Sequence, residues 1–235
     1  MKYDFHAHIL PGADHGSKGR EVTQEQLRLI AAAGTDIVVA TPHFYPHRDN
    51  LAAFLARRSA ALGELADCKA PAMLQILVGA EVQVCEGLEE MEELETLCVQ
   101  GTSVILLEMP HGPWSSRLTD TVSAIKERGL FPVLAHIDRY DEKRLEPLLQ
   151  QGIAAQLNAE AFEGFFARRR AVRLLRRGCV VALGSDLHGA KAEGYDAFLR
   201  MRARLGADAE KIFAQTADLL KNAENYTRLP GKSSF

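Results

Sequence analysis

The sequence predicts an α/β protein, a distorted (β/α)7 TIM-like barrel in a single domain, and three observations lead to this fold class. Short runs rich in Val, Ile and Leu, typical of parallel strands buried on both faces, alternate with stretches of helical periodicity. Glycines follow the helical stretches at positions 34, 129, 152, 178 and 206, where a left-handed helix end suits glycine. Seven strand–helix units follow one another without a linker, which favours a barrel over an open doubly wound sheet.

Each expected strand is a short apolar run, and most are followed by a helical stretch. The strands are expected at residues 3–6, 36–41, 74–84, 103–109, 132–137, 154–158 and 180–185. The helices, in which apolar residues recur three or four positions apart, are expected at residues 23–33, 51–66, 88–98, 118–128, 142–150, 163–177, 195–205 and 208–221. The barrel domain is expected at residues 1–227. A disordered tail that holds Pro, Gly, Lys and Ser is expected at residues 228–235.

Composition and charge argue against several classes of protein. The 235 residues carry a net charge of −3 with a pI near 6.3, whereas a general nucleic-acid binder usually has a basic excess. The four cysteines are scattered without a C-x-x-C pair and predict reduced thiols. The chain shows no signal-peptide pattern and no apolar run near the ~20 residues that span a bilayer. We therefore expect a cytoplasmic protein with no membrane insertion and no nucleic-acid partner.

The first expected strand ends in a His-x-His pattern that is typical of a metal site. Side chains two apart on a strand lie on one face, so His6 and His8 can bind one ion together. Further candidate ligands stand at the ends of later strands: His43, Glu81, Glu108, His136, Asp186 and His188. A single His at such a place is usually a core or loop residue, but a buried carboxylate is costly without a partner. Because the C-terminal strand ends of a barrel meet at one rim, this set predicts a multinuclear metal site.

Other hydrolase mechanisms lack their sequence patterns. No Cys has an Arg six residues later, as a cysteine-based phosphatase requires, and residues 12–19 lack the Walker A spacing. No G-x-S-x-G elbow is present. The glycines after His8 are expected to let the loop approach a metal closely. His47 and His111 lie in loops beyond the strands and stay outside the expected ligand set.

One helix is rich in arginine and allows two interpretations. Its arginines stand at positions 168, 169, 170, 173, 176 and 177. The simpler interpretation is a solvated helix face, and the alternative is a docking surface for an acidic or phosphorylated partner. Exposed helices of this kind can also support a homo-oligomer, although no decisive patch identifies one.

Several of these stretches resemble one family. They are Phe5-His6-Ala7-His8-Ile9-Leu10-Pro11-Gly12, Thr41-Pro42-His43, Gly79-Ala80-Glu81, Ala135-His136-x-x-Arg139-Tyr140 and Ser185-Asp186-x-His188. Over nearly its whole length the chain is similar to the PHP (polymerase and histidinol phosphatase) superfamily. Within it, the chain resembles the bacterial tyrosine-protein phosphatase branch of capsule and exopolysaccharide synthesis. The resemblance implies a distorted (β/α)7 barrel with a trinuclear metal cluster, which hydrolyses phosphomonoesters by attack of a metal-bridged hydroxide on phosphorus.

The resemblance also implies the roles of single residues. A first ion would be held by His6, His8, Glu81 and Asp186, a second by Glu81, Glu108 and His136, and a third by His15, His43 and His188. Arg139 would bind the phosphate. Three divalent ions are thus expected, with manganese as the first choice and iron or zinc as alternatives.

Three positions depart from the pattern of the branch. His15 stands where the branch usually has Asp, which leaves Asp14 as an alternative ligand. No second Arg follows Asp186-x-His188 within several residues, and Lys191 is the available substitute, without the fork of a guanidinium. Asp138 replaces the usual Glu beside Arg139. Asp14, Asp138 or a bound water is expected to protonate the leaving oxygen.

The substrate implied by the resemblance is a phosphotyrosine protein, expected to be the tail of a bacterial tyrosine kinase in polysaccharide synthesis. Aryl phosphates are also easier substrates than phosphoserine, because a phenol with a pKa of about 10 leaves more readily than an alkyl alcohol. Two alternatives stay open. One is a phosphatase for a small phosphomonoester of the histidinol-phosphate type, and the other is a metal-stabilised regulatory protein with little turnover.

Overall fold

The computed structural model describes residues 1–221, apart from the side chains of residues 192–194. The expected tail at 228–235 and the end of the expected 1–227 domain lie outside the described residues. The strands are β1 (Tyr3–Ala7), β2 (Ile37–Ala40), β3 (His43–Phe44), β4 (Gln75–Val78), β5 (Glu81–Gln83), β6 (Val104–Glu108), β7 (Phe131–Leu134), β8 (Ala154–Asn158) and β9 (Val180–Gly184). The α-helices are α1 (Arg20–Ala32), α2 (Leu51–Ala66), α3 (Ser116–Glu127), α4 (Glu142–Gln150), α5 (Phe165–Arg176), α6 (Ala192–Leu205) and α7 (Ala207–Leu220).

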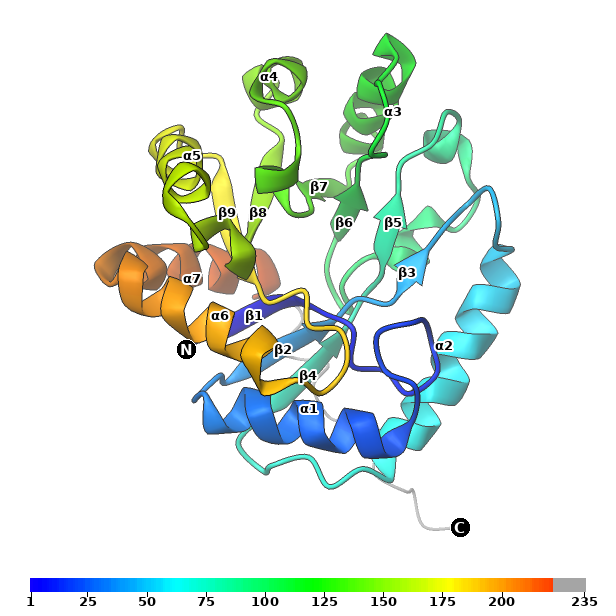
Figure 1. Ribbon diagram of the computed structural model, residues 1–235. Helices are drawn as coiled ribbons and strands as arrows, with labels where there is room; N and C mark the ends of the chain where they lie inside the picture. The colour runs from blue at the N-terminus through cyan, green and yellow to red at the C-terminus, as the bar shows by residue number, and fades with distance from the viewer. Residues whose placement is uncertain (222–235) are drawn as a thin grey trace.

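The strands form two parallel sheets with the helices on the outside (Figure 1). One sheet has the order β1-β2-β4, and the other has the order β3-β5-β6-β7-β8-β9. The last strand returns to the first, because the Asp186 N–H donates to the His6 carbonyl at 2.8 Å and the His8 N–H donates to the Leu187 carbonyl at 3.1 Å. The α/β fold with parallel strands is therefore confirmed, and its strand ends are brought around to one another.

Two expected elements differ from the structure. The strand expected at 74–84 is interrupted at Gly79 and Ala80, and its second half, β5, pairs with β3 rather than with β2. The helix expected at 88–98 is instead two 3-10 turns, Leu88–Glu90 and Leu94–Leu97. Five glutamates between residues 89 and 95 would lie three or four positions apart on a helix, where like charges repel.

The other helices agree with the expectation to within three residues, and α2 and α4 agree at both ends. All five glycines that were expected at helix ends have positive φ, between 52° and 88°. Inside the ring of helices the strands are buried almost without interruption, as in Ile37–Ala40 and Val104–Glu108. The four cysteines are free thiols. Within residues 1–221 no helix has the length and apolar character needed to cross a bilayer.

Candidate metal centre

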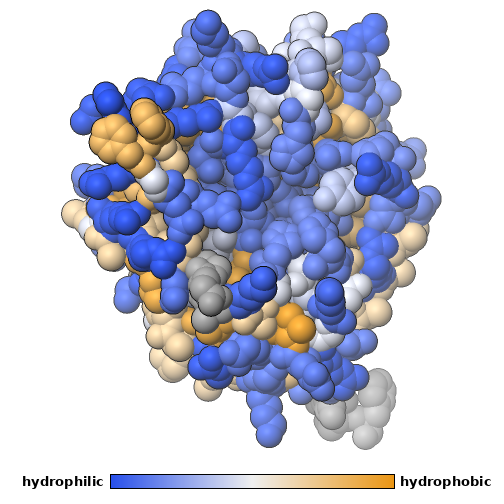
Figure 2. Space-filling view, in the orientation of Figure 1, coloured by the Kyte–Doolittle hydropathy of each residue, from blue (hydrophilic) through white to orange (hydrophobic). Residues whose placement is uncertain are grey.

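The expected ligands gather at the C-terminal ends of the strands. His6 lies near the end of β1, His43 and Glu81 begin β3 and β5, and Glu108 ends β6, while the others lie just beyond β1, β7 and β9: His8, His136, Asp186 and His188. Except for His188, these side chains are at most 9% exposed. They line or lie beneath a pocket of about 750 Å³, which Figure 2 shows as a hydrophilic hollow at the centre of the view.

A first group contains four ligand atoms from three strand ends. The Nε2 atoms of His6 and His8 lie 3.1 Å apart. The same two nitrogens lie 3.1 and 3.2 Å from Glu81 Oε2 and 3.5 and 3.3 Å from Asp186 Oδ1. The four atoms thus surround one point, as four ligands of one ion would. This is the ligand group that the resemblance implies for the first ion.

A second group contains two carboxylates. Glu81, Glu108 and His43 each offer an atom within 4.8 Å of the others. His136 lies beside them, with its Nε2 atom 2.8 Å from Glu81 Oε1 and 3.7 Å from Glu108 Oε1. The expected trio of Glu81, Glu108 and His136 is therefore brought together, with His43 as a further neighbour.

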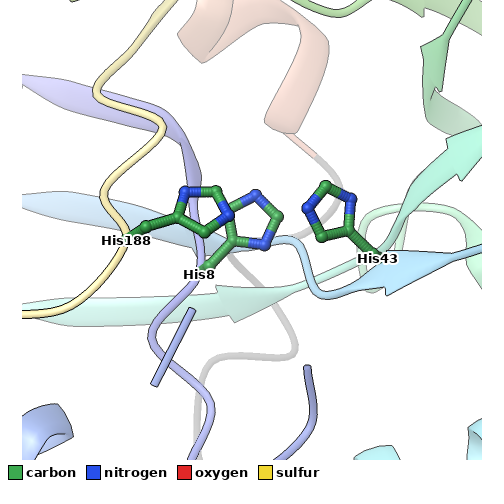
Figure 3. Close-up of side chains that lie close together, drawn as sticks. All are labelled: His8, His43 and His188. Atoms are coloured by element: carbon green, nitrogen blue, oxygen red, sulfur yellow. The ribbon is translucent and has the colours of Figure 1, made fainter. Parts of the chain in front are cut away.

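A third group consists of imidazoles. His8, His43 and His188 offer nitrogens within 4.8 Å of one another, and Figure 3 shows the three rings side by side. The ring centroid of His8 lies 4.0 Å from that of His188 and 4.3 Å from that of His43. His15 stacks on His43 at 4.8 Å and lies 4.7 Å from His188. His8 thus belongs to both the first and the third group, whereas the resemblance implies it for the first ion only.

The polar atoms of this cluster fit metal ions. His188 Nε2 is buried without a hydrogen-bond partner among the described residues, whereas His43 Nδ1 and Glu81 Oε2, also buried, face each other at 2.9 Å within the cluster. Leaving such atoms unpaired is costly. His188 Nδ1 is engaged with the Asp186 carbonyl at 2.9 Å, so its free Nε2 is left to face the pocket side of the cluster. Mixed imidazole and carboxylate donors around shared points are the chemistry of a divalent-ion site.

A layer of hydrogen bonds holds the ligands in place. Gln156, fully buried on β8, accepts from the His136 backbone N–H at 2.7 Å and lies 3.3 Å from His6 Nδ1. Its amide donates to Asn158 at 2.7 Å, and Asn158 donates to Asp186 Oδ2 at 3.0 Å. Such outer contacts orient imidazoles and carboxylates toward a metal. Gln156 was not predicted from the sequence, although a Gln within an otherwise apolar strand was the available signal.

Asp14 also belongs to this supporting layer. Its Oδ2 lies 2.7 Å from His8 Nδ1 and accepts from the His43 backbone N–H at 2.9 Å, while Oδ1 accepts from the Gly16 N–H at 2.8 Å. Both oxygens are thus engaged, and the carboxylate orients the first-strand imidazole. Its expected parts as a ligand or as a proton donor stay predictions.

Local backbone strain and close packing are concentrated at the cluster. Only three non-glycine residues of the described chain have positive φ, and two of them are His136 at 33° and Asp186 at 53°. Such strain persists only where surrounding contacts maintain it. A Cβ on Gly184 would lie 2.5 Å from Gln156 Nε2 and 2.6 Å from His6 Cβ. Glycine is needed there because β8 and β1 side chains press against the backbone.

Burial and neighbouring charges shift the pKa values of side chains in the cluster. Burial would raise the pKa of Asp186, but His6 and His8 outweigh it and hold that pKa far below its usual range. Burial would lower the pKa of His8, yet hydrogen bonds to Asp14 and the nearby carboxylates raise it well above 6.5. His188 differs, because burial and then His8 lower its pKa to about 4, so it is neutral at pH 7.

Further residues complete the pocket. Arg139 lines it and donates to Asp186 Oδ2 at 2.8 Å, with Glu160 at 3.7 Å. Asp138 lies outside the lining residues; its Oδ1 accepts from the Asn158 N–H at 3.1 Å, and burial raises its pKa. Lys191 is exposed and does not line the pocket. The lining residues that the sequence argument did not single out include Tyr45, Glu160, Glu163 and Arg200.

Comparison with known proteins decides the family. Residues 2–217 match the profile described as capsular polysaccharide synthesis, CpsB/CapC. This chain belongs to that family. It is 30% identical over 207 residues to the tyrosine-protein phosphatase CpsB of Streptococcus pneumoniae, which covers 79% of this chain and 82% of the relative. It is 25% identical over 245 residues to the tyrosine-protein phosphatase YwqE of Bacillus subtilis, with 97% and 94% covered.

Solved structures confirm the fold. A crystal structure from the work on YwqE of Bacillus subtilis and CpsB of Streptococcus pneumoniae, described as unique metal-dependent tyrosine phosphatases, superposes with a TM-score of 0.77. The two chains are 23% identical, and 94% of each is covered. The lactonase Lmo2620 of Listeria monocytogenes is more distant, with a TM-score of 0.51 and 13% identity. The resemblance drawn from the sequence motifs is thus confirmed at the level of family and fold.

Proposed function

We propose that this chain is a metal-dependent phosphatase that hydrolyses phosphotyrosine in a protein of polysaccharide synthesis. The observation that carries the proposal is the meeting of three overlapping ligand groups in one pocket that also holds Arg139. Membership of the CpsB/CapC family and the names of the relatives support the same activity.

We infer that the pocket holds up to three divalent ions, manganese first, with iron or zinc as alternatives. His6, His8, Glu81 and Asp186 would hold one, and the other two groups described above would hold the rest. Bound divalent ions in such a site polarise phosphoryl oxygens and lower the pKa of water, which makes a nucleophile available at neutral pH. Three carboxylates against three such ions leave about three positive charges, because the imidazoles must be neutral to bind. That excess favours a phosphate dianion.

The chain's own residues then position the phosphate. Arg139 is about a third exposed, lines the pocket and is held by Asp186 through Nη2, which leaves its other N–H groups available to a ligand in the pocket. A guanidinium in this place can bind two phosphate oxygens at once. Asp186 therefore has a double part, since Oδ1 faces His6 and His8 while Oδ2 holds the arginine.

A phenolic leaving group suits this pocket. Tyrosinate leaves with a pKa of about 10 and needs less protonation than an alkoxide. We propose Asp138, the neighbour of Arg139 whose pKa burial raises, as the group that supplies the proton through water. The open pocket of about 750 Å³ admits a side chain that projects from a polypeptide. A bacterial tyrosine kinase tail as the partner and a cytoplasmic location both stay predictions.

The proposal is tested with metal-reconstituted protein and three substrates. We expect turnover of a phosphotyrosine peptide well above that of histidinol phosphate or a nucleoside monophosphate. Glu81→Gln should abolish that turnover and remove bound metal, measured by elemental analysis, because Glu81 borders two ligand groups. Glu86→Gln, at an exposed glutamate outside the pocket, is the matched control. Faster turnover of histidinol phosphate than of the phosphotyrosine peptide would contradict the proposed substrate class. Inactivity on all three substrates would contradict the proposal that the chain is an enzyme.

A further inference from the structure

The beginning of α5 exposes two adjacent aromatic rings. Phe165 is 68% and Phe166 is 83% exposed, and their rings meet edge to face with centroids 5.5 Å apart. In Figure 2 apolar side chains lie among strongly hydrophilic ones over this part of the molecule. Because both rings are largely exposed, they add little to the stability of the fold through burial. An aromatic pair rimmed by charge therefore indicates contact with another molecule.

The arginines of α5, together with Arg177 directly after it, divide into two sets. Arg170, Arg173 and Arg177 face Glu142 and Glu146 of α4, with Arg173 Nη2 2.6 Å from Glu142 Oε1. The second set is Arg168, Arg169 and Arg176, which have no side-chain hydrogen bond or ion pair within the described chain. Arg169 instead lies over the Phe165 ring, 5.6 Å from its centroid. The helix thus presents three positive charges that have no ion-pair partner within residues 1–221.

Phe165 and the three arginines of the second set border one groove. It has a volume of about 490 Å³, and its lining contains no carboxylate: Phe165, Arg168, Arg169, Val172, Arg173 and Arg176. The members recur three or four positions apart, so they lie along one side of the helix. We call this surface the α5 groove. Its charge and its aromatic ring complement an extended peptide that carries acidic side chains.

The α5 groove adjoins the metal pocket. Glu163 lines that pocket and stands two residues before Phe165. Arg200 of α6 also lines the pocket and donates to Glu163 Oε1 at 2.5 Å, while Glu160, another acidic lining residue, lies 3.7 Å from Arg139. The two glutamates that line the pocket near α5 are thus each close to an arginine of the pocket.

We propose that the α5 groove binds an acidic segment of the substrate polypeptide next to the phosphotyrosine that enters the metal pocket. The inference rests on the proposed function for the phosphotyrosine, but the groove itself is argued from charge and exposure alone. The arginines would attract carboxylates of the peptide, and the ring pair would pack against its apolar atoms.

The test compares Arg168→Ala/Arg169→Ala/Arg176→Ala with the parent protein. The control removes equal charge elsewhere through Arg20→Ala/Arg28→Ala/Arg117→Ala, at positions 57–78% exposed. Substrates are a phosphotyrosine peptide with acidic flanks, the same peptide with neutral flanks, and p-nitrophenyl phosphate. Binding of a fluorescent, unphosphorylated acidic peptide to metal-free protein is measured by anisotropy.

We expect the α5 variant to lose about 10-fold in kcat/KM on the acidic peptide, through KM, and about as much in binding. The neutral peptide, p-nitrophenyl phosphate and the control variant should change less than about twofold, and raising salt toward about 0.5 M should reproduce the loss in the parent. Equal losses on all substrates, or no preference for acidic flanks in the parent, would overturn the inference. The inference would also be overturned if the parent protein formed an oligomer and Phe165→Ser/Phe166→Ser dissociated it, because the rings would then pack against a second copy of the chain. If the parent protein bound the acidic peptide and the α5 variant did not, but the parent hydrolysed none of the substrates, the result would contradict the proposed function and leave the α5 groove supported.

Discussion

Gln156 offers the sharpest test of how the fold supports the metal centre. We consider Gln156→Leu, which keeps the side-chain volume close to that of Gln and removes its polar atoms. Leucine would leave the His136 backbone N–H and the His6 imidazole without their shared acceptor, and Asn158 Oδ1 without its donor. All of these groups are buried.

The magnitude follows from these contacts. An orphaned buried polar group costs about 1–3 kcal/mol. The bond to His136 is short at 2.7 Å, the bond to His6 is long at 3.3 Å, and Asn158 keeps its own bond to Asp186 Oδ2 at 3.0 Å. We therefore expect roughly 2–5 kcal/mol less free energy of unfolding. Because His6 loses the contact that fixes its ring, metal affinity should fall about 10- to 100-fold.

Two measurements check this prediction. Urea unfolding of metal-free protein gives the stability change, and competition with a chromogenic chelator gives the change in metal affinity. Gln75→Leu is the matched control, because Gln75 lies on β4 and makes no side-chain hydrogen bond within the described chain. Metal affinity within twofold of the parent, in a protein that is folded, would refute the orienting part assigned to Gln156.

Two further predictions concern packing and pH. Gly184→Ala should lower the free energy of unfolding by about 1–3 kcal/mol in thermal or urea unfolding, because its Cβ would press on Gln156 and His6. For metal-free protein, the raised pKa of His8 stabilises the fold below its unfolded value of about 6.5, and this stability is lost as pH rises through the folded pKa. Stability should therefore decline above pH ~6.5 by up to about 1.4 kcal/mol per pH unit from this group, and His8→Gln should flatten the decline.

Each of these predictions has its own control. Gly63→Ala, within α2 and with open space around its Cβ, should be neutral or slightly stabilising. An equal loss at Gly63 and Gly184 would show that the close approach at Gly184 carries no cost. For the pH series, an unchanged slope in His8→Gln above pH ~6.5 would show that His8 is not protonated in the metal-free fold.

Much of the site was predictable because its chemistry is unusual for a buried strand end. His-x-His after an apolar run, Glu81 and Glu108 at apolar strand ends, and Asp-x-His after the last strand are costly to bury and so indicate ligands. The regular alternation of apolar runs and helical stretches likewise predicted α/β units and most element ends.

The tertiary contacts decided the rest. Whether His8 borders one ligand group or two depends on the approach of His188 and His43 from other strands, which no local pattern encodes. Gln156 supports the ligands only because β8 lies beside β7 in the sheet and its side chain reaches His6 of β1. Likewise, the sequence of six arginines between residues 168 and 177 does not indicate which of them form ion pairs. Only the packing of α4 against α5 neutralises some of them and leaves the others to face water, since ion pairing depends on distance in space.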